Sequence, residues 1–232
     1  TRDFILLGLG LSYQTTNILE FYANISQNYR SVTFADISIV NPAYIVNPNI
    51  NDEKGYTADL GVRGNIINRI SYNMNLFYLL YEERIGFIQK IQSDGNIKSE
   101  RGNVGDAKIS GIESLIDLKL VTVNPSKFKC SYYINTSFIQ SEYINSTQNG
   151  IKGKNVEFIP KINVKTGINM TYNALSSNIQ YTYLSQQYTD ATNSIESNLS
   201  GVIGEIPDYK VIDLSLTYQN KKYKIESGIN NL

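Results

Sequence analysis

The sequence has 232 residues, and its 21 Lys and Arg balance 21 Asp and Glu, so it offers no basic surface that would indicate nucleic-acid binding. It has no histidine and a single cysteine, which excludes Ser–His and Cys–His triads, histidine ligation of zinc or haem, and any intrachain disulfide within these residues. Abundant Tyr, Ile, Val and Thr favour strands, and no apolar run reaches the length of a transmembrane helix. The N-terminus has neither an initiator Met nor a signal segment, so we expect the chain to begin inside a longer protein.

The first half of the sequence alternates apolar and polar residues. Leucine and tyrosine occupy every second position over residues 7–13, with glycine and serine between them. This period of two predicts a strand with one apolar and one polar face. By the same pattern, strands are expected at residues 7–14, 19–26 and 56–63 and from 70 past Glu82, with short turns at 15–17 and 65–68 and a long loop at about 35–55.

The second half repeats this pattern. Asn124, Pro125 and Ser126 predict a tight reversal between two of its strands. Further strands are expected at residues 112–120, 128–138, 162–170, 179–183, 212–219 and 223–230, with long loops at about 141–157 and up to Pro207.

The connections between these roughly ten strands alternate strictly between a few residues and about fifteen to twenty residues. Outer-membrane barrels have this arrangement, with short turns on the periplasmic side and long loops outside. Several strands also sustain the alternation for about ten residues, which is long for a soluble sheet and sufficient to cross a bilayer at a tilt. The sequence therefore predicts an all-β fold, an antiparallel transmembrane β-barrel.

A soluble β-sandwich is the alternative. In a barrel the polar face, which carries Glu20, Asp59, Arg63 and Glu113, lines the lumen and the apolar face meets lipid. In a sandwich the polar face would be solvated and the apolar face would form the core. The pattern of any single strand fits both, and only the loop rhythm and the strand lengths favour the barrel.

Three segments resemble TonB-dependent receptors. They are NPNINDEKGYTADLGVRG at 47–64, RGNVGDAKISGIE at 101–113 and DLSLTYQNKKYKIESGINNL at 213–232. Within that family, residues 24–37 and 188–214 look most similar to the ferric-citrate receptor branch. The resemblance extends over nearly the whole chain and keeps the order and spacing of these segments.

The resemblance implies a fragment of a larger receptor. Such receptors have a plug domain inside a 22-stranded barrel. Residues 1–232 are then the C-terminal portion of the barrel domain, about ten of its strands, with the plug, the TonB box and the final strand outside this sequence. The implied location is the bacterial outer membrane, and the implied partners are the lipid bilayer, a ferric siderophore and the TonB–ExbB–ExbD system. No enzyme activity and no covalently bound cofactor are expected, since ferric iron is carried as a chelate.

Candidate ligand contacts follow from position and chemistry. A ferric citrate complex presents carboxylate oxygens, which guanidinium, ammonium and amide donors bind. The upper lumen and loops offer Arg30, Arg84, Gln89, Lys90 and Arg101. Gln89 is the preferred candidate, because we expect it in the outer loop after the long strand, where the ferric-citrate branch also shows a glutamine. The alternative for each is a solvated loop residue.

Arg63 and Glu113 are expected to face the lumen lower down and to pair with the plug or with neighbouring charges of the wall. Three function classes therefore stay open. They are a ferric-citrate or similar siderophore receptor, a TonB-dependent receptor for another siderophore, cobalamin or a glycan, and a soluble β-sheet binding protein. Because a ten-stranded piece of a barrel has two open edges, we also expect residues 1–232 not to fold alone.

Overall fold

The computed structural model describes residues 5–16, 18–67, 69–121, 127–197 and 203–232. The expected reversal at Asn124–Ser126 lies outside these residues. Among the described residues, no helix has the length and apolar character needed to cross a membrane.

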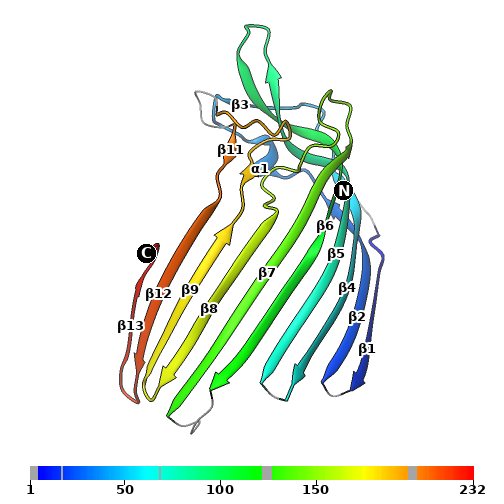
Figure 1. The fold of residues 1–232 in the computed structure, drawn as a ribbon. Helices are drawn as coiled ribbons and strands as arrows, with labels where there is room; N and C mark the ends of the chain where they lie inside the picture. The colour runs from blue at the N-terminus through cyan, green and yellow to red at the C-terminus, as the bar shows by residue number, and fades with distance from the viewer. Residues whose placement is uncertain (1–4, 17, 68, 122–126, 198–202) are drawn as a thin grey trace.

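The long strands of the described chain form one antiparallel sheet, in which they lie side by side in chain order as a curved wall (Figure 1). The path of the sheet runs through β1 (Gly8–Thr16), β2 (Leu19–Arg30), β4 (Glu53–Ile66), β5 (Ile70–Ile91), β6 (Ile97–Val121), β7 (Phe128–Asn145), β8 (Ile162–Tyr172), β9 (Leu175–Leu184), β12 (Tyr209–Gln219) and β13 (Lys224–Ile229). The predicted all-β antiparallel sheet is confirmed.

The strand registers align the apolar residues into rows that cross the sheet. Leu60 on β4 lies opposite Leu76 on β5, Leu76 opposite Ile112 on β6, and Ile112 opposite Phe138 on β7. These four side chains are half exposed, between 50% and 57%. A sandwich would bury them in its core, whereas a bilayer covers such a face with lipid. The single sheet with its exposed apolar face therefore excludes the soluble sandwich.

Long and short connections lie at opposite ends of the wall (Figure 1). The long ones contain structure that the sequence did not predict. The loop expected at 35–55 includes the short helix α1 (Phe34–Ile37) and β3 (Tyr44–Val46), which pairs in parallel with β6. The loop before Pro207 includes β10 (Gln187–Tyr188), which pairs with β11 (Glu205–Ile206).

The connection between β5 and β6 corrects the expected loop rhythm. Instead of a long loop, both strands continue well past the end of the wall and are joined by only the residues between Ile91 and Ile97 (Figure 1). The extension is irregular at its base, with register shifts between Tyr81 and Arg84 and between Arg84 and Ile85. The strict alternation of short and long connections was therefore wrong at this position.

The buried core lies at the long-loop end and not within the wall. It joins the β5–β6 extension to β7 and to the loops that follow β7 and β9. Its members are Ile88, Val104, Ala107, Ile109, Tyr143, Ile151, Val156 and Ala191. Because a one-layer wall can bury apolar residues only where loops fold over it, this core fixes the loops around the upper lumen.

Candidate functional site

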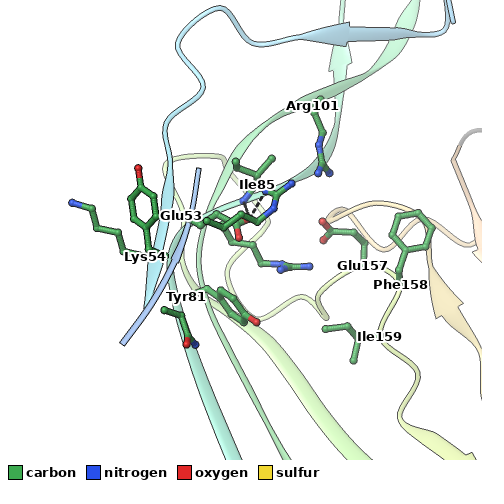
Figure 2. A pocket seen from close by; sticks show the side chains of 12 residues that line it. Glu53, Lys54, Tyr81, Ile85, Arg101, Glu157, Phe158 and Ile159 are labelled. Carbon is green, nitrogen blue, oxygen red and sulfur yellow. Dashed lines mark hydrogen bonds and ion pairs between the residues drawn. The ribbon is translucent and has the colours of Figure 1, made fainter. Parts of the chain in front are cut away.

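A charged pocket of about 560 Å³ lies at the long-loop end of the sheet (Figure 2). This volume falls within the range of small-molecule sites. The ends of β2 and β4, interior positions of β5 and β6 and the loop after β7 contribute its lining, which consists of Asn28, Tyr29, Arg30, Glu53, Lys54, Tyr81, Arg84, Ile85, Arg101, Glu157, Phe158 and Ile159.

Strand alternation places much of this lining on the polar face of the sheet. Successive side chains of a strand point to opposite faces. Arg30 therefore shares a face with Glu20 on β2, and Glu53 shares a face with Arg63 on β4. The pocket is the upper end of the polar face that would line a barrel lumen.

Arg84 reaches the same face because of a β-bulge. Regular alternation along β5 would put Arg84 with Tyr78 and Leu80 on the apolar face. The register instead passes from Tyr81 opposite Ala107 to Arg84 opposite Gly105, and Glu83 adopts a positive φ of 55°. The extra residue of a bulge shifts the facing of those that follow it, which turns Arg84 towards the pocket.

The carboxylate of Asp36 binds two of the pocket arginines, Arg30 and Arg101. It accepts hydrogen bonds from Arg30 Nη2 at 2.8 and 2.9 Å, and from Arg101 Nη2 at 2.7 Å and Nε at 3.2 Å. Thr33 donates to the same carboxylate through its backbone N–H and its hydroxyl. Burial alone would raise the pKa of Asp36, but the hydrogen bonds from Arg101, Thr33 and Arg30 outweigh it and hold that pKa well below its usual value.

Two buried glutamates lie among the arginines of the pocket. Glu53 is 4% exposed and accepts hydrogen bonds from the backbone N–H of Ile85 at 2.5 Å and from Arg30 Nη1 at 3.4 Å. Glu157 is 2% exposed and accepts a hydrogen bond from the hydroxyl of Tyr143 at 2.7 Å. Both carboxylates act electrostatically on Arg84. Lys54 extends away from this group (Figure 2). The charges that face into the pocket are therefore those of the arginines and the two glutamates, and they are of both signs.

Three of the five predicted ligand contacts meet in this pocket, namely Arg30, Arg84 and Arg101. Lys90 does not line it and forms an ion pair of 3.2 Å with Glu100. Their expected place in the upper lumen and loops indicated the arginines. Strand alternation could also have indicated Glu53, because it places Glu53 on the same face of β4 as Arg63. Asp36 and Glu157 lie in loops, whose paths the alternation does not predict.

Gln89 lies within β5, so its expected place in an outer loop was wrong. Its side-chain amide donates to the hydroxyls of Ser194 at 2.6 Å and Thr192 at 3.2 Å, in the loop after β9. Thr192 in turn donates to Asp190, which is fully buried. Burial raises the pKa of Asp190 above its usual value, although hydrogen bonds from Thr192 and Gln89 oppose the shift.

The other two predicted residues lie lower on the polar face. Arg63 forms a two-pronged ion pair with Glu20, with both N–O distances at 2.9 Å, and lies over the ring of Tyr22. Glu113 lies opposite Asn75 and Ser137 and lines a second hollow that also includes Lys165.

A single tilted sheet with an apolar outer face, a polar inner face and a charged pocket at its long-loop end is the wall of a transmembrane β-barrel. Residues 2–232 match the family described as TonB dependent receptor-like, beta-barrel. The chain therefore belongs to the TonB-dependent receptor β-barrel family. Proteins of this family are transporters of the bacterial outer membrane, not enzymes.

Solved structures share this fold. The unliganded ferric citrate transporter FecA is 21% identical, with a TM-score of 0.74, and the match covers 97% of this chain and 33% of FecA. The ferric yersiniabactin uptake receptor FyuA from Yersinia pestis is 19% identical, with a TM-score of 0.68 and coverages of 97% and 31%. The copper transporter OprC is 14% identical, with a TM-score of 0.68 and coverages of 97% and 33%. The chain thus spans about a third of the length of each.

Proposed function

We propose that this chain is the C-terminal portion of the barrel of an outer-membrane receptor that takes up an anionic ferric chelate, ferric citrate or a similar carboxylate siderophore. The observation that carries the proposal is the pocket in which Arg30, Arg84 and Arg101 meet at the long-loop end of the polar face. The resemblance of residues 24–37 and 188–214 to the ferric-citrate receptor branch and the likeness of the fold to FecA and FyuA support it.

The arginines would bind the carboxylate oxygens of the chelate. A guanidinium group presents parallel donors that match a carboxylate and keeps its charge at every physiological pH. Asp36 orients Arg30 and Arg101, so these two groups need little rearrangement to bind. Arg84 also lines the pocket, and its buried Nε has no hydrogen-bond partner within the described part of the chain.

Transport would consist of binding and passage, with ferric iron as cargo and no chemical step in this wall. We infer that the TonB–ExbB–ExbD system supplies the energy through other segments of the receptor, a plug and a TonB box. Uptake of a different cargo by the same architecture, such as another siderophore, cobalamin or a glycan, is the second candidate.

The test uses the full-length receptor in a strain whose own ferric citrate uptake is deleted. Arg101→Met is expected to weaken ferric citrate binding at least about tenfold, because it removes a charge-assisted contact while keeping much of the side-chain volume. Radioactive iron uptake and equilibrium binding measure the effect. Lys222→Met, in the turn after β12 at the opposite end of the wall, is the matched control and should have no effect. A wild-type receptor that neither binds nor transports ferric citrate or a related carboxylate chelate would contradict the proposal.

A further inference from the structure

The pocket contains a carboxylate that an anionic ligand would have to approach. Glu157 lies in the loop after β7 and points towards the arginine side chains of the pocket (Figure 2). Its Oε2 accepts a hydrogen bond from the hydroxyl of Tyr143. A carboxylate has about four acceptor positions on its two oxygens, so Glu157 keeps acceptor capacity on the side of the pocket.

The fold makes room for this carboxylate. A Cβ atom at Gly86 would collide with Oε1 of Glu157 and would come within 3.0 Å of the Tyr143 hydroxyl. Residues on both sides of Glu157 are also fixed, since Val156 belongs to the buried core and the backbone N–H of Phe158 donates to Tyr188 at 2.8 Å. The position of Glu157 is therefore set by its surroundings and does not depend on ligand.

A buried glutamate beside arginines discriminates between ligands. A chelate that presents only carboxylates would bring like charges together at Glu157, which weakens its binding. A chelate that presents a hydroxyl, amide or ammonium donor there gains a charge-assisted hydrogen bond. A polar site rejects the wrong ligand when that ligand leaves a buried charge of the site unpaired or faces it with a like charge.

We propose that Glu157 is a specificity-determining residue, and that the receptor selects a ferric chelate with carboxylates on the side of Arg30 and Arg101 and a hydrogen-bond donor on the side of Glu157. This inference rests on the proposed uptake of an iron chelate through the same pocket. It names the cargo class as a carboxylate siderophore that also carries a hydroxyl, amide or ammonium donor not bound to the iron, preferred over ferric citrate itself.

Two probes that differ in one group test the inference. The first is ferric citrate, and the second is the ferric complex of citric acid mono(2-aminoethyl)amide, in which an amide that ends in an ammonium group takes the place of one carboxylate. Equilibrium binding to the purified full-length wild-type receptor is expected to favour the aminoethylamide probe about tenfold. Glu157→Gln should tighten ferric citrate binding and weaken binding of the aminoethylamide probe, each by about tenfold.

Two further variants separate charge from structure. Glu157→Asp keeps the charge and should keep the wild-type preference, and heat-modifiable migration on a gel checks that each variant is folded. Glu196→Gln removes a carboxylate from an exposed loop position outside the pocket and should change neither affinity. The inference alone would be overturned if Glu157→Gln left the affinities for both probes unchanged. It would also be overturned if the substitution shifted both affinities in the same direction. A wild-type receptor that binds neither probe would overturn the proposed function together with it.

Discussion

Asp36 and Asp190 are both buried in the outer loops, but their surroundings shift their pKa values in opposite directions. Asp36 is held by Arg30, Arg101 and Thr33, so the pKa is lowered despite burial. Asp190 has only neutral hydrogen-bond partners such as Thr192, so burial raises the pKa. Because a shifted pKa is a difference in stability between protonation states, the two loops should respond to pH in opposite ways.

Asp36→Asn is expected to loosen the loop of residues 31–52. It removes the charge that two guanidinium groups share, which should cost about 2 kcal/mol locally and speed amide exchange roughly thirtyfold. In the wild type the pKa of Asp36 lies below its usual 3.8, so the ion pairs stabilise the loop above that value and lose their effect only as pH falls through the lower folded value. Hydrogen exchange of the full-length receptor should therefore show constant protection of this loop between about pH 7 and 5, after correction for intrinsic rates. A loss of protection within that range would contradict the assignment.

The loop around Asp190 should behave in the reverse manner. Its folded pKa lies above the usual value of 3.8, so its stabilising contribution is complete below that value and is lost as pH rises through the folded pKa. After correction for intrinsic rates, the protection of residues 187–197 should accordingly be greatest in acid and fall towards neutral pH. Asp190→Asn is the control, because an amide does not titrate and should abolish this dependence. Protection that is independent of pH in the wild type would show that burial does not govern this carboxyl group.

The sequence indicated the arginines of the site better than its acids. Arg30, Arg84 and Arg101 were predicted from their expected place in the upper lumen and loops and from the chemistry of a carboxylate ligand, and the pocket contains all three. Asp36 and Glu157 were not predicted, because each lies in a loop and meets its partners only through folding. A one-dimensional pattern with a period of two carries information on strand faces and none on loop paths.

At the level of strands, aromatic side chains lie across glycines of the neighbouring strand on the polar face. The ring of Tyr22 on β2 covers Gly61 on β4, which is its direct partner in the register. Tyr133 on β7 covers Gly167 on β8 in the same way. A Cβ at either glycine would overlap the ring, so each tyrosine–glycine pair favours one register between its two strands.

Gly61→Ala is expected to destabilise the barrel by about 1–3 kcal/mol, because the new methyl group displaces the Tyr22 ring in a packed site. Tyr22→Ala in the same receptor should remove most of this penalty, although alone it loses the hydrogen bond from the Tyr22 hydroxyl to Asn73. Urea unfolding of the full-length protein in detergent, for both single variants and the double variant, measures the coupling. Additive effects of the two substitutions would mean that the ring does not depend on Gly61.

Strand periodicity predicted most of the wall and failed at one hairpin for a definable reason. The strand predicted from Ile70 runs past Glu82, but the next strand was expected only from residue 112, with a long loop between the two. The structure shows that β5 continues, but two register shifts on either side of Arg84 exchange the faces of the strand. A bulge breaks the period of two without ending the strand. For the same reason Gln89 was assigned to a loop.

For the whole chain, the sheet ends at two strands that have a neighbour on one side only. Every residue of β1 and of β13 is exposed. Such edges carry unpaired backbone groups, which lipid cannot satisfy and which promote association in water.

Residues 1–232 produced alone are therefore expected to aggregate on transfer from denaturant into water and to form no closed pore in detergent, whereas the full-length receptor folds. Size-exclusion chromatography of both proteins under the same conditions is the measurement. A soluble, monomeric and stable preparation of residues 1–232 would contradict this expectation.

The β5–β6 hairpin carries a consequence for the cell surface. β6 alone has 25 residues, and at about 3.3 Å per residue it is up to roughly 80 Å long, more than twice what is needed to cross the hydrocarbon layer at a tilt. Its tip, where Gly95 adopts a positive φ of 82°, has open space around it. An epitope inserted beside Gly95 would be within reach of an antibody on intact cells, while the same epitope at Lys221–Lys222 would be hidden until the envelope is opened. Antibody labelling of an epitope in this hairpin on living bacteria would thus show which end of the wall faces outwards.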